Sequence, residues 1–111
     1  MITHRKSTAK QKVIDFLEGW KKDLDRDGLN MGDSIMYRIE DGHPGPDPDA
    51  DLKNCFTLYA DSFLYEIIEY YRSDGMHAWL GKQWERFLQG LSQHGWIEEP
   101  YNCGVYVFYN D

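Results

Sequence analysis

Residues 84–99, WERFLQGLSQHGWIEE, decide the fold, because within them a helix ends and a hairpin begins. Apolar residues recur at helical spacing and, with one residue from just upstream, form a single stripe: Leu80, Trp84, Phe87, Leu88 and Leu91. Gly95 stands where a left-handed residue commonly ends a helix, and Trp96 follows in position for the accompanying hydrophobic contact. Burying such a stripe stabilises a fold by about 10 kcal/mol before entropy is subtracted, so this helix is expected to belong to the core.

Strands are expected on both sides of this helix. Downstream, Trp96–Glu99 and Val105–Tyr109 flank a loop that contains proline and glycine, which predicts a hairpin. Upstream, residues 35–40 alternate between β-branched or aromatic side chains and other types, which predicts a short strand with one buried face. Residues 41–51 hold three prolines and two glycines, so an exposed loop is expected there.

A first helix is expected over residues 8–25, where apolar side chains again recur at helical spacing: Val13, Phe16, Leu17, Trp20 and Leu24. Thr8 and Gln11 have the spacing of a capping box, in which a hydroxyl and an amide satisfy free N–H groups of the first turn. Asp27 and Gly28 are expected to end this helix.

A second helix is indicated by an apolar stripe made of Phe56, Ala60, Phe63, Ile67 and Tyr71. Further apolar residues fall beside or behind this stripe, so such a helix is buried on two sides or offers its second side to a partner. Because Asp61 and Ser62 are common helix caps, an extended lead-in over residues 53–59 is the alternative to a longer helix.

These elements predict a single domain of residues 1–111 in the α+β class, with three helices and a small antiparallel sheet. Their order (helix, strand, helix, helix, strand, strand) resembles the winged helix-turn-helix superfamily. The residues that carry the resemblance are the helix-to-hairpin segment Leu91–Ile97 and the run Cys103–Phe108. The long acidic loop and the long apolar second helix depart from the pattern of that family.

The resemblance implies that the third helix reads DNA and that the hairpin forms the wing. On this alternative the base-reading side chains are Lys82, Gln83, Arg86 and Gln89. Glu98 and Glu99 in the wing oppose contact with phosphates, and the wing has no Lys or Arg. A nucleic-acid partner is therefore expected less than a protein partner.

The net charge of the chain is −7 and is unevenly distributed. Residues 1–22 carry a net charge of +4, residues 23–74 a net charge of −9, and residues 75–111 a net charge of −2. An acidic middle segment repels nucleic acid and favours a basic protein surface or cations.

Aromatic residues point to the same class of partner, because eight Tyr and four Trp exceed what a small core needs. Tyr106, for example, is not expected to face the core together with Val105 and Val107. We therefore expect a non-enzymatic acidic protein that binds a basic protein partner, in the manner of inhibitors and immunity proteins, or a second copy of itself. The expected contact residues are Asp47, Asp49, Asp51, Tyr70, Tyr71 and Trp79.

A weak divalent-cation site is a further alternative. Asp23, Asp25 and Asp27 have the spacing of the first ligands of an EF-hand loop, and Gly28 follows them. Ser34 stands where such a loop has its bidentate glutamate, so an acidic turn after a helix is the simpler interpretation.

Catalysis and cofactor binding are not expected, because the sequence holds no phosphate-binding loop and no recognisable nucleophile–base pair. Cys55 and Cys103 lack a histidine at a known spacing. Two cysteines in a chain without an export signal or a membrane-spanning apolar run are expected to be reduced thiols of a cytoplasmic protein.

Overall fold

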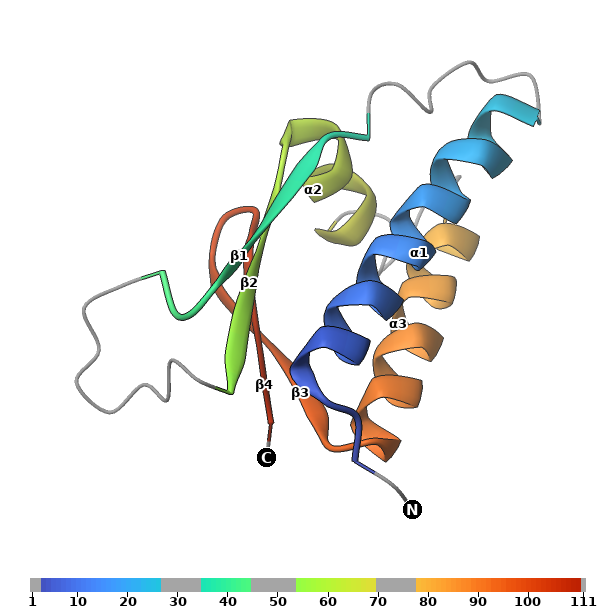
Figure 1. Ribbon diagram of the computed structural model, residues 1–111. Coiled ribbons are helices and arrows are strands. Elements are labelled where there is room, and N and C mark those ends of the chain that lie inside the picture. Colours follow the sequence, from blue (N-terminus) through green and yellow to red (C-terminus); the bar gives the residue numbers. More distant parts are fainter. Residues whose placement is uncertain (1–2, 27–34, 45–53, 70–77, 111) are drawn as a thin grey trace.

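The computed structural model describes residues 3–26, 35–44, 54–69 and 78–110, which form three helices and four strands (Figure 1). The helices are α1 (Lys6–Arg26), α2 (Ser62–Glu69) and α3 (Ala78–Gln93). The strands are β1 (Tyr37–Asp41), β2 (Cys55–Ala60), β3 (Trp96–Asn102) and β4 (Val105–Asn110). The α+β class and the order of the predicted elements are confirmed, and β2 is an additional strand.

The four strands form one antiparallel sheet in the order β1-β2-β4-β3, so β2 and β4 are central and β1 and β3 are edges. α1 and α3 lie side by side across one face of the sheet, and α2 follows the end of β2 (Figure 1). The register pairs Phe56 with Phe108 and Leu58 with Tyr106. Because side chains alternate between the two faces of a strand, these four side chains share the face that the helices cover.

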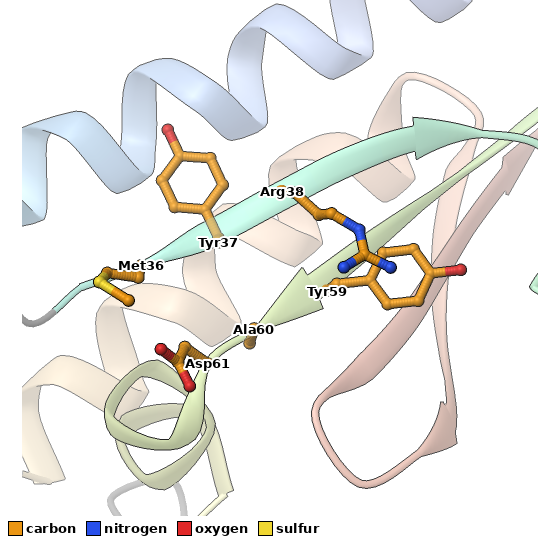
Figure 2. Close-up of a pocket in the computed structure, with 6 residues that line it drawn as sticks. All are labelled: Met36, Tyr37, Arg38, Tyr59, Ala60 and Asp61. Carbon is orange, nitrogen blue, oxygen red and sulfur yellow. The ribbon is translucent and has the colours of Figure 1, made fainter.

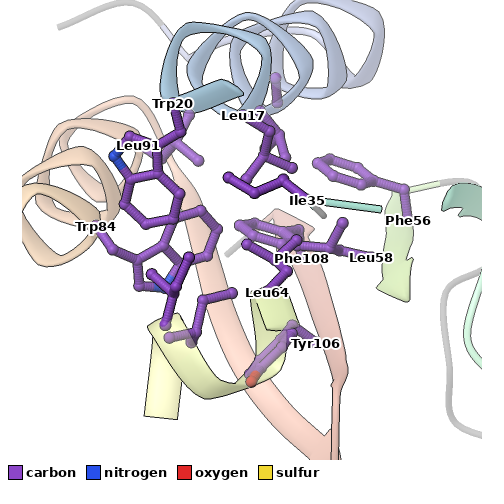
Figure 3. Close-up of a cluster of buried hydrophobic side chains, with 14 of the residues drawn as sticks. Leu17, Trp20, Ile35, Phe56, Leu58, Leu64, Trp84, Leu91, Tyr106 and Phe108 are labelled. Atoms are coloured by element: carbon purple, nitrogen blue, oxygen red, sulfur yellow. The ribbon is translucent and has the colours of Figure 1, made fainter. Parts of the chain in front are cut away.

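The core between the helices and the sheet is aromatic (Figure 3). Phe56 and Phe108 stack with their ring centroids 5.0 Å apart, and Trp84 meets the Phe108 ring edge-on at 6.4 Å. α1 contributes Trp20, whose indole N–H donates to Gln83 Oε1 in α3 at 2.8 Å. Aromatic pairs contribute about 0.5–1.5 kcal/mol each beyond the burial of their area, so these contacts fix how α1 and α3 sit on the sheet.

The prediction that Phe56 and Ala60 belong to the second helix is wrong, because residues 55–60 form the central strand β2. A separation of four residues fits one face of a helix and equally one face of a strand, so the stripe alone did not separate the two. The alternative of an extended lead-in is confirmed. Asp61 immediately precedes α2, and its carbonyl accepts a hydrogen bond from the Tyr65 N–H at 2.8 Å.

α1 is slightly longer than predicted at both ends, and its buried stripe is confirmed at Val13, Leu17 and Trp20. The predicted capping box is wrong, because Thr8 already lies inside the helix. The Gln11 amide instead donates to Asp15 Oδ1 at 2.8 Å, one turn further along. Among the described helices, none combines the length and the apolar character that crossing a membrane would require.

Two glycines with left-handed backbone shape the hairpin. Gly95 has φ 85° and ends α3, as predicted, and Trp96 next to it is buried. Gly104 has φ 72° in the turn between β3 and β4, where a Cβ would lie 2.8 Å from the Ala60 carbonyl oxygen. The close approach of two backbones, together with the positive φ, accounts for glycine at position 104.

Replacing Gly104 by alanine is expected to lower the free energy of unfolding by about 2 kcal/mol, because alanine disfavours positive φ and its methyl group would press on Ala60. Gly19 in α1 is the matched control, since a Cβ there meets no atom within 4 Å. Gly19→Ala is expected to raise the same free energy by about 1 kcal/mol through helix propensity. Chemical denaturation measures both changes, and a neutral Gly104→Ala would contradict the described turn.

Candidate functional site

The acidic and aromatic residues expected to contact a partner lie mostly outside the described part of the chain: Asp47, Asp49, Asp51, Tyr70 and Tyr71. Trp79 lies in α3, but its side chain is outside the described set as well. These contact residues stay predictions, and the candidate site has to be built from the described surface.

The described elements are divided by charge. α1 and α3 together carry eight Lys or Arg residues and five Asp or Glu residues. The four strands and α2 carry one Arg and six Asp or Glu residues. The pair of long helices is thus net positive and the sheet with α2 is net negative, and the two groups meet where Asp41 of β1 pairs with Lys6 and Lys10 of α1.

A pocket of about 380 Å³ opens at the net negative sheet, where β1 begins and β2 ends (Figure 2). This β1 pocket is lined by Met36, Tyr37, Arg38, Tyr59, Ala60 and Asp61. The Met36 carbonyl accepts a hydrogen bond from the Asp61 N–H at 2.9 Å, so the backbone joins the two lining segments. The Met36 side chain is 55% exposed, which leaves a large apolar group at the pocket in contact with water.

Polar contacts hold the side chains around the β1 pocket. The guanidinium carbon of Arg38 lies 4.2 Å from the centroid of the Tyr59 ring, and Arg38 Nε donates to Glu40 Oε1 at 3.1 Å. Tyr37 points the other way, toward α1, where its hydroxyl donates to Glu18 Oε1 at 2.7 Å (Figure 2). Partial burial, this hydrogen bond and the Glu18 charge raise the pKa of Tyr37 well above its ordinary value, so the hydroxyl stays protonated.

The turn between β3 and β4 meets the same end of the sheet. The Gly104 carbonyl accepts a hydrogen bond from the Ala60 N–H at 2.8 Å, and Val105 pairs with Tyr59. Tyr101 in this hairpin is 50% exposed. Among the described residues, Met36 and Tyr101 are the large hydrophobic side chains that are exposed. These two exposed side chains lie at opposite edges of the sheet, because Met36 precedes β1 and Tyr101 belongs to β3.

The face of the sheet away from the helices is partly covered by the residues that follow β1. The Gly42 N–H donates to the Cys55 carbonyl at 3.0 Å, and the Gly42 carbonyl accepts from Thr57 Oγ1 at 2.6 Å. The His43 ring then contacts the Tyr101 ring edge-on, with centroids 4.9 Å apart. Thr57 is buried although it lies on the face opposite the core. These contacts fix where the acidic connection between β1 and β2 leaves the sheet.

Replacing Thr57 by valine is expected to lower the free energy of unfolding by about 1–2 kcal/mol, because the Gly42 carbonyl loses a buried donor. Thr57→Ser, which retains the hydroxyl, is the control. Amide hydrogen exchange should show a larger loss of protection at Gly42 in the valine variant than in the serine variant. Equal protection in the two variants would show that the hydroxyl does not hold this segment.

Three of the four side chains expected to read DNA lie on the exposed face of α3, and the fourth does not. Lys82, Arg86 and Gln89 are exposed, and their spacing of four and three residues places them on one face of the helix. Gln83 does not belong to this face, because its amide oxygen accepts the indole N–H of Trp20 and joins α3 to α1. Gln93 is exposed one turn beyond Gln89 and extends the polar face instead.

The divalent-cation alternative stays a prediction. Asp23 lies in α1, whereas Asp27 and the side chain of Asp25 are outside the described residues. Within the described ranges, no three His, Cys, Asp or Glu side chains come together in a way that could hold a metal ion.

Tyr106 faces the core, and the expectation that it does not do so together with Val105 and Val107 is confirmed. Its hydroxyl donates to Glu69 Oε1 in α2 at 2.8 Å. Val107 points to the opposite face and is buried as well, because both faces of β4 are covered at this position. Met36 was not among the candidate residues of the sequence analysis. The alternation of residues 35–40 nevertheless directs Met36 away from the side on which Ile35 is buried.

Both cysteines are reduced thiols in the described structure: Cys55 is buried in β2, and Cys103 is exposed in the turn between β3 and β4. No family model, curated protein or solved structure matches the chain.

Proposed function

We propose that this protein is a non-enzymatic interaction protein that binds a basic segment of a protein partner at the β1 pocket. The exposed thioether of Met36 beside this pocket, at the net negative sheet, is the observation that carries the proposal. Methionine adapts its shape to different surfaces and is common where proteins bind varied apolar groups.

The charges around the pocket favour a basic partner. Asp61 at the pocket and Glu66 in α2 are both exposed carboxylates. The basic group of the pocket is Arg38, whose charge is already shared with Glu40 and the Tyr59 ring. A basic segment would approach a net negative surface, which raises the rate of association at low ionic strength.

The dimensions of the pocket suit one inserted side chain better than a whole small ligand. A volume of about 380 Å³ lies near the lower end of the range of ligand pockets, about 300–1,000 Å³. A lysine or arginine of the partner would lay its aliphatic stem on Met36 and direct its charged head to Asp61. A few such central contacts commonly supply most of the affinity of a protein interface.

The proposal predicts that purified wild-type protein retains one basic protein from an extract of the source cells, and that Met36→Asp reduces the recovery about tenfold by removing a central apolar contact. Lys82→Ala on α3 is the matched control and should retain the same protein. The purified pair should then show a dissociation constant that rises with salt concentration. Equal recovery by the wild type and Met36→Asp would overturn the proposed site.

A second candidate function, DNA binding through α3, is favoured by one specific observation. The exposed face of this helix carries Lys82, Arg86 and Gln89, which are residue types that contact base edges and phosphates. The acidic groups of the hairpin still oppose phosphate, because a hydrogen bond from a neutral donor leaves a carboxylate charged. Glu99 accepts a hydrogen bond from the Tyr109 hydroxyl, and the exposed residues of the turn next to Gly104 are uncharged.

On this second candidate, the protein should retard a mixed-sequence DNA duplex at low salt. The double variant Lys82→Ala/Arg86→Ala should lose this retardation and reduce the slope of log affinity against log salt by about two, since each residue neutralises one phosphate. Lys10→Ala is the control, because Lys10 is paired with Asp41 beside β1. Absence of retardation by the wild type at low salt would exclude this function.

A further inference from the structure

A second pocket, of about 250 Å³, lies between the start of α1 and the end of α3. Three of its lining residues can carry positive charge: His4, Lys12 and His94. The β1 pocket lies at the end of the sheet where Tyr59 pairs with Val105, whereas His94 precedes the opposite end, where Trp96 pairs with Asn110. The two pockets are thus separate sites on the molecule.

We propose that this second pocket binds a phosphate group, either free or in a nucleic-acid backbone. The ammonium group of Lys12 and the imidazoles of His4 and His94 all line one cavity, and each of these side chains carries N–H groups that can donate hydrogen bonds. A phosphate group has several acceptor oxygens, so it can take charge-assisted hydrogen bonds from more than one of these donors at once. The side-chain amide of Gln93, which also lines the pocket, supplies a neutral donor.

The two imidazoles are held in place by main-chain contacts. The His4 N–H donates to the His94 carbonyl at 3.0 Å, and the His4 carbonyl accepts the indole N–H of Trp96 at 2.8 Å. The rings stack with their centroids 4.0 Å apart and an angle of 18° between their planes. Because the backbone positions both rings before any ligand is present, an anion would bind without much loss of side-chain freedom.

The electrostatics of the pocket favour an anion. Partial desolvation lowers the pKa of His4, and the nearby His94 and Lys12 lower it further because a third positive charge there is repelled. Among the described lining residues, none is acidic. Asp15 lines the neighbouring pocket that shares Lys12. A bound oxyanion would offset the repulsion from His94 and Lys12 and so raise the pKa of His4.

Gly90 keeps one wall of this pocket open. It lies inside α3, where glycine weakens a helix, yet a Cβ at this position would meet no atom within 4 Å. Close packing therefore does not account for the glycine. A large side chain at position 90 would project beside the pocket, which provides a way to obstruct the site without changing any charge.

Phosphate affinity should rise as the pH falls toward the range in which histidines protonate. Without an anion, the folded protein holds the His4 proton less tightly than the unfolded chain does. His4 therefore makes the stability of the fold depend on pH. Its contribution is fully present above the pKa of His4 in the unfolded chain and is lost as the pH falls through the lower pKa of the folded protein. Sulfate should show the same trend more cleanly, because its charge does not change in this range while that of phosphate does.

Histidine titration by NMR tests the proposal on the full-length protein. In sodium phosphate, the pKa of His4 should rise by about half a unit relative to sodium chloride of equal ionic strength, and the ring resonances of His94 should shift. His43, whose ring contacts Tyr101 and which does not line this pocket, is the internal control. Equal responses of all three histidines to phosphate would overturn the proposal, because they would indicate general screening.

Two variants separate binding in the pocket from surface attraction. Lys12→Gln should weaken phosphate binding about tenfold through loss of a charge-assisted contact, and Gly90→Leu should weaken it without any change of charge. Lys82 is exposed on α3 outside the pocket, so Lys82→Gln is the control. This variant should bind inorganic phosphate as the wild type does. Thermal melts confirm that each variant is folded. If Lys82→Gln and Lys12→Gln weaken binding equally, the pocket is not the site.

The source of the phosphate is decided by comparing inorganic phosphate with a short DNA oligonucleotide. A response to inorganic phosphate that the oligonucleotide does not reproduce assigns the site to a free phosphate ligand. A response to the oligonucleotide at much lower phosphate-group concentration, sensitive to Lys12→Gln, assigns it to the nucleic-acid backbone. If the pKa of His4 changes neither with inorganic phosphate nor with the oligonucleotide, the proposal is overturned. This result would leave the proposed protein-binding function at the β1 pocket unaffected.

Discussion

The stacked rings of Phe56 and Phe108 set the register between β2 and β4, the two central strands. A slip of one residue would turn every core side chain of one strand to the opposite face, so this pair selects a single arrangement of the sheet. The same register places Tyr59 beside Val105 at one end and leaves the start of β3 at the other. Neither Phe56 nor Phe108 lines the β1 pocket or the second pocket. The register of this pair nevertheless determines which residues meet at each end of the sheet.

The division of charge has a simple structural origin. α1 and α3 pack on one face of the sheet (Figure 1), and Lys12 and Lys22 of α1 and Lys82 and Arg86 of α3 are exposed. The acidic residues of the strands and α2 remain on the other elements. Since charges in salt solution are screened over about 8–10 Å, these two oppositely charged groups of elements can act on different partners. A net charge of −7 thus describes neither group well.

Local signals in the sequence were sufficient for α3 and the hairpin, because Gly95 marks the helix end and the strands alternate beyond it. β2 was harder to predict, because Phe56 and Ala60 fit the periods of both a helix and a strand. The burial of Tyr106 and Val107 on opposite faces depends on covering segments far away in the sequence. The role of Gln83 depends on Trp20, and Met36 becomes a candidate only when its exposure is known.

The contrast between the two cysteines gives this protein a built-in attachment point. Cys55 is shielded within β2, whereas Cys103 is exposed in the turn that meets the end of β2. A thiol-reactive fluorophore would therefore modify Cys103 selectively in the folded state, without any engineered substitution. Its emission would report the approach of another molecule to this end of the sheet, and labelling of Cys55 would signal that the strands had separated.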